Sequence, residues 1–156
     1  VSASSVGLDL VVENSEKLIS LGMRVIEEAN HRIEVLHPER AEVKTVDVTE
    51  FYDGDPASGE GTSVVIYGKS HMDRSPCGTG TTAKMTLLHQ RKQLLVDQPY
   101  RNRSPLGTWF EGRIINTCRV GDYQAVIARV SGSANITGFH RFVVDKQDPF
   151  PEGFLL

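Results

Sequence analysis

The segment DRSPCGTGTTAK, residues 73–84, places a cysteine between a proline and a glycine where a helix is expected to begin. Pro76 fixes the backbone before Cys77, and Gly78 and Gly80 leave the backbone after it without side-chain cover. If the helix starts at these glycines, its first N–H groups lack intrahelical acceptors and form the positive end of the helix dipole. That end favours a thiolate beside it and binds carboxylates. The segment therefore predicts a thiol next to an anion-binding site.

A small carboxylic acid bound there would have its charged group on the N–H groups and its α-carbon near the sulfur of Cys77. A thiol in such a place is suited to proton abstraction as well as to nucleophilic attack. A second interpretation is a buried structural cysteine in a glycine turn, because unpaired cysteines are among the most buried residues. The residues alone leave both interpretations open.

The spacing disfavours two other kinds of site. A phosphate-binding loop requires Gly-x4-Gly-Lys-Ser/Thr, and residues 78–85 fail that pattern at two positions. A cysteine hydrolase requires a partner histidine and an orienting Asn or Asp. None of the five histidines stands in a recognisable hydrolase signature, and His71, the nearest in sequence to Cys77, is expected at a turn or on the surface. The second cysteine, Cys118, lies in strand-like sequence and is expected to be structural.

Length and composition describe one ordinary globular domain, with 156 residues, 39% apolar and 24% charged. A net charge of −3 and a pI near 6.0 argue against nucleic acid or an anionic membrane as the main partner. No apolar stretch has the length of a membrane span and no signal peptide is visible. Two cysteines do not make a disulfide framework, so a reducing, cytoplasmic setting is expected. Val1 in place of an initiating methionine favours a processed or trimmed product.

Hydrophobic periodicity predicts an α+β fold. Two helices are expected, over residues 15–33 and about 79–95, and the second is the more apolar. Strands are expected over residues 32–37, 43–52, 62–68, 108–115, 123–132 and 134–145. Many strands with two helices suggest a strongly curved sheet around one buried helix, which would be the helix that follows Cys77.

The motif DRSPCGTGT resembles the second catalytic-cysteine motif of the proline racemase family, which includes the hydroxyproline epimerases. The segments VVIYG, TAKM, GTWFEGRI and ITGFHRFVVDKQDPFPEGF also resemble family segments, in family order, so that nearly the whole chain is covered. The resemblance implies the diaminopimelate-epimerase fold, in which two similar domains each wrap a curved, mostly antiparallel sheet around a central helix. The active site of that fold lies in the cleft between the domains.

The same resemblance implies cofactor-independent inversion of the α-carbon of proline or hydroxyproline by two cysteines on opposite faces of the ring, with no metal. Cys77 would be one of the two bases, and the N–H groups of Gly78 and Thr79 would bind the substrate carboxylate. Asp73 would bind the ring nitrogen, although an aspartate there can also serve only a local turn. Tyr67 would lie against the ring, or else belong to the core of a strand.

The family's other cysteine stands in a Met-Cys-Gly-His-like motif that is absent from this sequence. Residues 1–156 therefore resemble the C-terminal half of a racemase whose N-terminal catalytic-cysteine domain is missing. The last ~20 residues are expected to pack on that domain, and the full-length protein is expected to form a homodimer. The isolated chain is expected not to racemise proline. An inactive fragment and a small-carboxylate binding domain are the non-enzymatic alternatives.

Two positions bear on the substrate. Relatives that dehydrate trans-3-hydroxyproline are expected to carry threonine at the position of Cys77, so the cysteine disfavours that reaction. Hydroxyproline epimerases tend to carry a histidine near Val48, where this chain offers no polar group for the ring hydroxyl. We therefore expect proline as the substrate, with 4-hydroxyproline 2-epimerase as the alternative.

Overall fold

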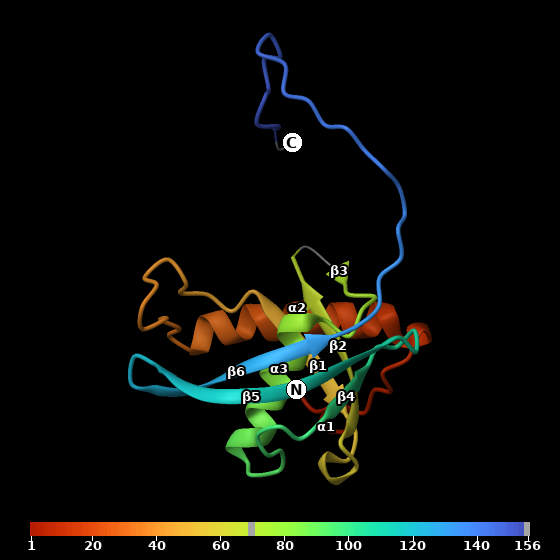
Figure 1. The fold of residues 1–156 in the computed structure, drawn as a ribbon, viewed down its shortest axis with the longest axis vertical. Coiled ribbons are helices and arrows are strands. Elements are labelled where there is room, and N and C mark those ends of the chain that lie inside the picture. Colours follow the sequence, from red (N-terminus) through yellow and green to blue (C-terminus); the bar gives the residue numbers. More distant parts are fainter. Residues whose placement is uncertain (69–70, 155–156) are drawn as a thin grey trace.

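The computed structural model describes residues 1–68 and 71–154, which form three α-helices, two 3-10 turns and a six-stranded sheet (Figure 1). The helices are α1 (Ala3–Val6), α2 (Ser15–Arg32) and α3 (Gly78–Gln90), and the 3-10 turns are η1 (Val12–Asn14) and η2 (Pro56–Ser58). The strands are β1 (Val48–Asp53), β2 (Glu60–Tyr67), β3 (His71–Met72), β4 (Tyr100–Arg103), β5 (Trp109–Val120) and β6 (Tyr123–Ser131).

The sheet has the order β1-β2-β4-β5-β6, with the short β3 paired to β2. Every pairing is antiparallel except that of β2 with β4. Parallel neighbours require a crossover connection, and the crossover from β2 to β4 contains α3. The remaining strands curve past this helix, as β5 and β6 do in Figure 1. The α+β fold with a curved, mostly antiparallel sheet around a central helix is therefore confirmed.

One core lies between α3 and the sheet. Met85 and Leu88 of α3 pack with Tyr100 of β4 and Ile114 of β5, and all four are at most 1% exposed. The N-terminal end of α3 lies against β2, where Gly80 is close to Val65.

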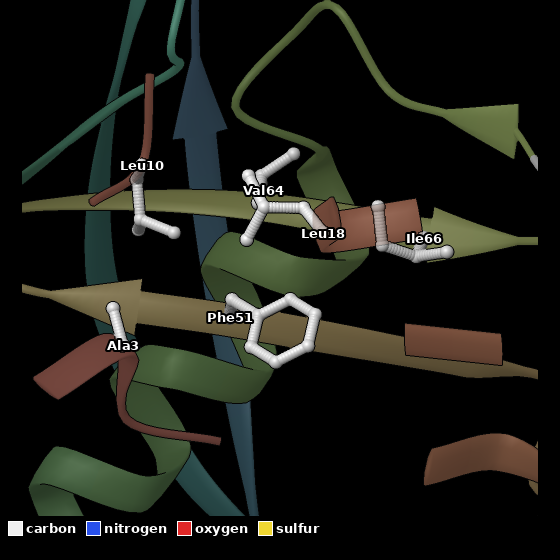
Figure 2. Packing of buried hydrophobic residues seen from close by; sticks show 6 residues of the cluster. All are labelled: Ala3, Leu10, Leu18, Phe51, Val64 and Ile66. Carbon is white, nitrogen blue, oxygen red and sulfur yellow. The ribbon is translucent and has the colours of Figure 1, made fainter. Parts of the chain in front are cut away.

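The other core lies on the opposite face of β1 and β2, under α1 and α2. Leu18 of α2 packs with Phe51 of β1 and with Val64 and Ile66 of β2, as Figure 2 shows. Gly22 lets α2 approach closely, because a Cβ atom there would lie 2.7 Å from the side chain of Ile66. Residues 63–66 of β2 are thus buried on both faces of the sheet, which explains the apolar run in β2.

Several expected elements are wrong in place or extent. Residues 32–37 form no strand, and the strand expected over 43–52 begins only at Val48, because the connection from α2 finds no sheet neighbour and stays exposed. Helix α3 ends at Gln90 instead of near residue 95. The short strand β4 was not expected from its sequence, YRNR, which lacks an apolar pattern.

The strand expected over residues 134–145 is also wrong. Residues 132–154 are exposed and irregular, and Figure 1 shows this tail leaving β6 and running away from the domain. A strand needs a neighbour for its backbone hydrogen bonds, and the tail has none within the described part of the chain. Its exposed apolar side chains are Ile136, Phe139, Phe142, Val143, Val144, Phe150 and Phe154.

Within residues 1–68 and 71–154, no helix has both the length and the apolar character that crossing a membrane requires.

Candidate active site at the N-terminus of helix α3

Cys77 caps the N-terminus of α3, which begins at Gly78. The sulfur of Cys77 lies 3.4 Å from the backbone nitrogen of Gly80, whose N–H donates to it, and 3.3 Å from the hydroxyl oxygen of Thr79. The thiol is free and half-buried, so it is not the fully buried cysteine of the second interpretation.

The first two N–H groups of α3 are available to a ligand. Gly78 and Thr79 are exposed, and no acceptor for their N–H groups is found among the described residues. An open hollow of about 510 Å³ adjoins them, lined by Gly78, Thr79, Thr82, Ala83, Ala128 and Val130. The arrangement therefore offers a carboxylate two free donors beside the thiol.

The two glycines of the motif differ from one another. No atom lies within 4 Å of a Cβ placed at Gly78, whereas a Cβ at Gly80 would lie 2.9 Å from Val65 and 3.1 Å from a carboxylate oxygen of Glu50. Only Gly78 leaves room for a ligand near the backbone. The expectation that both glycines serve this purpose is wrong for Gly80, which is buried so that α3 can pack on the sheet.

Asp73 has a local role as well as a possible ligand-binding one. One oxygen, Oδ1, accepts hydrogen bonds from the N–H of Ser75 at 3.0 Å and from its hydroxyl at 3.1 Å. The Ser75 hydroxyl oxygen in turn accepts from the N–H of Cys77 at 3.1 Å. Asp73 thus closes the turn that leads into Cys77. No donor to its other oxygen, Oδ2, is found in the described part of the chain.

Tyr67 and Val48 are brought together by the pairing of β1 with β2, in which they stand directly opposite one another. Val65 packs under the start of α3, and Tyr67 is two residues further along the same face of β2. Tyr67 is 41% exposed and stacks on His71 at 5.7 Å between ring centroids. The alternative of a strand-core tyrosine is therefore wrong.

A buried polar cluster lies behind Cys77, and the sequence analysis missed it. The side-chain nitrogen of Asn102, on β4, lies within hydrogen-bond distance of three acceptors, Ser63 at 2.7 Å, Thr81 at 2.9 Å and the carbonyl of Pro76 at 3.2 Å, among which its two N–H bonds are shared. Asn102, Ser63 and Thr81 are each 0% exposed. Ser63 sits within an apolar run and Asn102 between two arginines, so no periodic signal marks either as inward-facing.

Two ionisable side chains complete this cluster. Burial raises the pKa of Glu50, on β1, to about 7, while a hydrogen bond from Ser63 and the charge of Lys84 oppose the rise. Burial lowers the pKa of Lys84, on α3, to about 8, and Glu50 opposes that change. The ammonium of Lys84 lies 3.2 Å from the ring centroid of Tyr52. These polar side chains thus lie beside Val65 where α3 packs on the sheet.

Other candidate ligands lie elsewhere. Cys118 is a free, half-buried thiol on β5, paired with Ala125 of β6, and it does not line the hollow beside α3. Within residues 1–68 and 71–154, no group of three or more His, Cys, Asp or Glu side chains could hold a metal ion.

Comparison with known proteins decides the family. The sequence profile described as "Proline racemase" matches residues 1–155. The chain belongs to the proline racemase family. It is 44% identical over 158 residues to a proline racemase of Clostridioides difficile, with 100% of this chain and 47% of that protein covered.

Other relatives in the family carry different names. A trans-3-hydroxy-L-proline dehydratase of Burkholderia cenocepacia is 38% identical over 151 residues, covering 95% of this chain and 45% of that protein. The crystal structure of a hydroxyproline epimerase from Agrobacterium vitis, with bound trans-4-OH-L-proline, matches with a TM-score of 0.86 and 31% identity. This match covers 100% of this chain and 45% of that structure. The chain spans about half the length of the curated relatives it matches.

Proposed function

We propose that this chain provides one of the two acid–base groups of an amino-acid racemase that inverts the α-carbon of proline. The observation that carries the proposal is the free thiol of Cys77 over the open N-terminus of α3, 3.4 Å from the nitrogen of Gly80. Beside it stand two N–H groups without acceptors in the described residues and an open hollow. This set combines a base with an anion site, which is the combination that abstraction of an α-proton requires.

In the proposed reaction, the substrate carboxylate binds the N–H groups of Gly78 and Thr79, and the α-hydrogen faces the thiolate of Cys77. Removal of this proton leaves the electron pair of the C–H bond on the substrate, and the carboxylate takes up part of the added charge. The two N–H groups stabilise this charge. The proton remains on the sulfur of Cys77, while a second thiol on the opposite face gives its proton to the α-carbon. The configuration is thereby inverted without a cofactor.

The ring nitrogen of proline is cationic, so it needs a negative partner. The Oδ2 atom of Asp73 is the proposed one, because Oδ1 is held by Ser75 and the turn is closed without Oδ2. The aromatic face of Tyr67 is proposed to pack against the ring. It is exposed on the same face of β2 as Val65, which packs beneath Gly80.

We further infer that the second thiol belongs to an upstream half that faces this one across the hollow. The relatives are about twice as long as this chain, which supports that inference. The exposed apolar tail after β6 supports it as well, because its side chains would be buried by packing on the upstream half. We also propose, from the family resemblance alone, that the complete protein forms a homodimer.

The replacement Cys77→Ser in the complete protein tests the proposal. Serine keeps the shape but is a far weaker base, so we expect proline racemisation, followed by polarimetry, to fall by about a thousandfold. The matched control is Cys118→Ser, which removes the other free thiol, on β5 and not at the N-terminus of α3, and should retain activity. Retained racemisation in Cys77→Ser would contradict the assignment. Pyrrole-2-carboxylate, a planar mimic of the flattened intermediate, should protect Cys77 from alkylation.

A second candidate is 4-hydroxyproline 2-epimerase, favoured by the structural neighbour named as a hydroxyproline epimerase with bound trans-4-OH-L-proline. Val48 favours proline instead, because it stands opposite Tyr67 and offers a ring hydroxyl no hydrogen bond. We expect kcat/KM of the complete protein for L-proline to exceed that for trans-4-hydroxy-L-proline. The replacement Val48→His should reduce that preference by about tenfold. A preference for hydroxyproline in the unaltered protein would establish the second candidate.

A further inference from the structure

The backbone at Cys77 is held in a conformation that residues other than glycine rarely adopt. Its φ is 58° and its ψ is 124°. A side chain at positive φ is strained, and such strain persists only where the surroundings over-determine the backbone. Something in the fold must therefore hold the peptide unit that enters Cys77.

That peptide unit, between Pro76 and Cys77, is bound at both ends. Its N–H donates to the Ser75 hydroxyl at 3.1 Å, as described above. Its carbonyl oxygen accepts from the amide of Asn102 at 3.2 Å and from the hydroxyl of Thr81 at 3.2 Å. Rotation of this peptide, which would release the positive φ, breaks all of these bonds.

The orientation of the Asn102 amide follows from the chemistry of its neighbours. The carbonyl of Pro76 can only accept, so the nitrogen of the amide must face it. The same nitrogen reaches Thr81 at 2.9 Å and Ser63 at 2.7 Å, which fixes the side chain from three sides. Asn102 therefore ties together β2, β4, the first turn of α3 and the residue before the thiol.

Burial of Asn102 is unfavourable in free energy. It is 0% exposed, and its oxygen Oδ1 has no hydrogen-bond partner among the described residues. An unpaired buried acceptor costs free energy that an apolar residue of similar shape would not cost. Stability alone does not account for an asparagine here, whereas a need for a donor toward Pro76 does.

We propose that Asn102 is a positioning residue, which with Thr81 locks the Pro76–Cys77 peptide and so aims the thiol at the substrate. The proposal rests on the proposed racemase function for its catalytic consequence. Its geometric part, the orientation of the Cys77 sulfur over the N–H of Gly80, is independent of the reaction.

The first test replaces Asn102 by leucine, which has the same branching and no donor, in the complete protein. We expect kcat for proline racemisation to fall by about tenfold or more, as the loss of one buried hydrogen bond implies. KM should change by less than about threefold, because the N–H groups of Gly78 and Thr79 remain in α3. A KM increase with unchanged kcat would overturn the proposal.

The second test uses a matched pair of threonines. Thr81 and Thr49 are both buried, and each hydroxyl donates to a backbone carbonyl, at 3.2 Å to Pro76 and at 3.0 Å to Gly22. Thr49→Val thus removes an equivalent bond on the α2 face of the sheet. We expect only Thr81→Val to lower kcat, and Thr81→Ser to restore it. Equal losses in Thr81→Val and Thr49→Val would mean that stability alone is at work and would overturn the proposal.

The rate of iodoacetamide alkylation at Cys77, measured by peptide mass spectrometry at about pH 7, tests the positioning role of Asn102 separately from the proposed racemase function. We expect Asn102→Leu and Thr81→Val to slow it by about threefold or more, since the sulfur loses its alignment with the N–H of Gly80. Unchanged alkylation in both variants, in a protein that racemises proline, refutes the positioning role and leaves the proposed function intact. Slowed alkylation in a protein that racemises nothing supports the positioning role and refutes the function.

Discussion

At the scale of single residues, Gly78 and Gly80 show how one motif combines two purposes. Both are glycines in the first turn of α3, but a Cβ at Gly78 would meet open space and a Cβ at Gly80 would meet Val65. Gly78 is therefore available to a ligand, and Gly80 is required by the packing of helix on sheet. Substitution of Gly80 should therefore lower the stability of the fold, and substitution of Gly78 should weaken ligand binding.

We expect Gly80→Ala to destabilise the chain by about 1–3 kcal/mol, because the added methyl group overlaps Val65 and Glu50. Gly78→Ala should change the free energy of unfolding by less than about 0.5 kcal/mol. In the complete protein, Gly78→Ala should instead raise KM for proline by about threefold or more, since its methyl group stands where the carboxylate is proposed to bind. Urea unfolding and steady-state kinetics measure the two effects, and equal stability losses in both variants would contradict the distinction.

The candidate site could be predicted in part from these residues. The sequence placed Cys77 at a helix start because proline, glycine and unpaired N–H groups act locally. It did not decide whether Asp73 closes a turn or binds a ligand. In the structure, the Oδ1 atom of Asp73 closes the turn. It could not reveal Asn102, because the bonds of that residue span 21 to 39 positions in the chain.

At the scale of elements, the contact between α3 and β1 contains a half-buried acid, Glu50, and a buried base, Lys84. The pKa of Glu50 is raised from 4.5 to about 7, first by burial, and that of Lys84 is lowered from 10.5 to about 8, also first by burial. Each group therefore resists its charged form in the folded chain. The stability of this helix–sheet contact should depend on pH in the windows that these shifts define.

Between about pH 4.5 and pH 7 the folded chain holds a proton on Glu50 that the unfolded chain has released. The free energy of unfolding contributed by Glu50 therefore falls as pH rises through this window. We expect Glu50→Gln, which cannot ionise, to flatten the fall, as measured by urea unfolding of the chain at a series of pH values. Glu13→Gln, an exposed carboxylate change, controls for net charge. An unchanged slope in Glu50→Gln would contradict the shift.

For Lys84 the sign is opposite. Between about pH 8 and pH 10.5 the unfolded chain holds a proton that the folded chain has released. The contribution of Lys84 to the free energy of unfolding therefore grows as pH rises from about 8 to 10.5, and it is lost as pH falls toward 8. The two windows do not overlap, so one pH series distinguishes the two groups.

Elements with a strong local signal were predicted well, and those that depend on a partner were not. The helix expected from residue 15 is present as α2, and its apolar stripe packs on β1 and β2. The strands expected over residues 32–37 and 134–145 are absent, although both have the strand-like pattern. A strand is stabilised by its neighbours in a sheet, and the pattern cannot say whether a neighbour is present.

At the scale of the whole molecule, we propose that the chain presents one side of a site. The hollow at the N-terminus of α3 is open, and it is lined by Gly78, which follows Cys77 in the chain, although neither cysteine is itself among the lining residues. The apolar tail after β6 extends away from the domain (Figure 1). Both features are what a protein half would leave exposed when its counterpart is absent, which agrees with a length of about half that of its relatives.

We expect the 156-residue chain alone not to racemise proline, because inversion needs a proton donor on the face of the ring opposite Cys77. Polarimetry measures the complete inversion, and exchange of the α-hydrogen for deuterium measures the removal of the proton. The complete protein, assayed at the same thiol concentration, is the control. Full turnover by the isolated chain would refute the two-thiol proposal for this protein.

The sequence by itself determined the family, the helix that follows Cys77 and the exposure of its first N–H groups, because each depends on residues adjacent in the chain. Only the tertiary structure decided that Val48 faces Tyr67, that Gly80 is buried and that Asn102 holds the peptide before the thiol. These facts depend on strand register and on the crossover that brings β4 beside β2. Contacts between distant segments are fixed by the packing of the whole domain, and no local pattern encodes them.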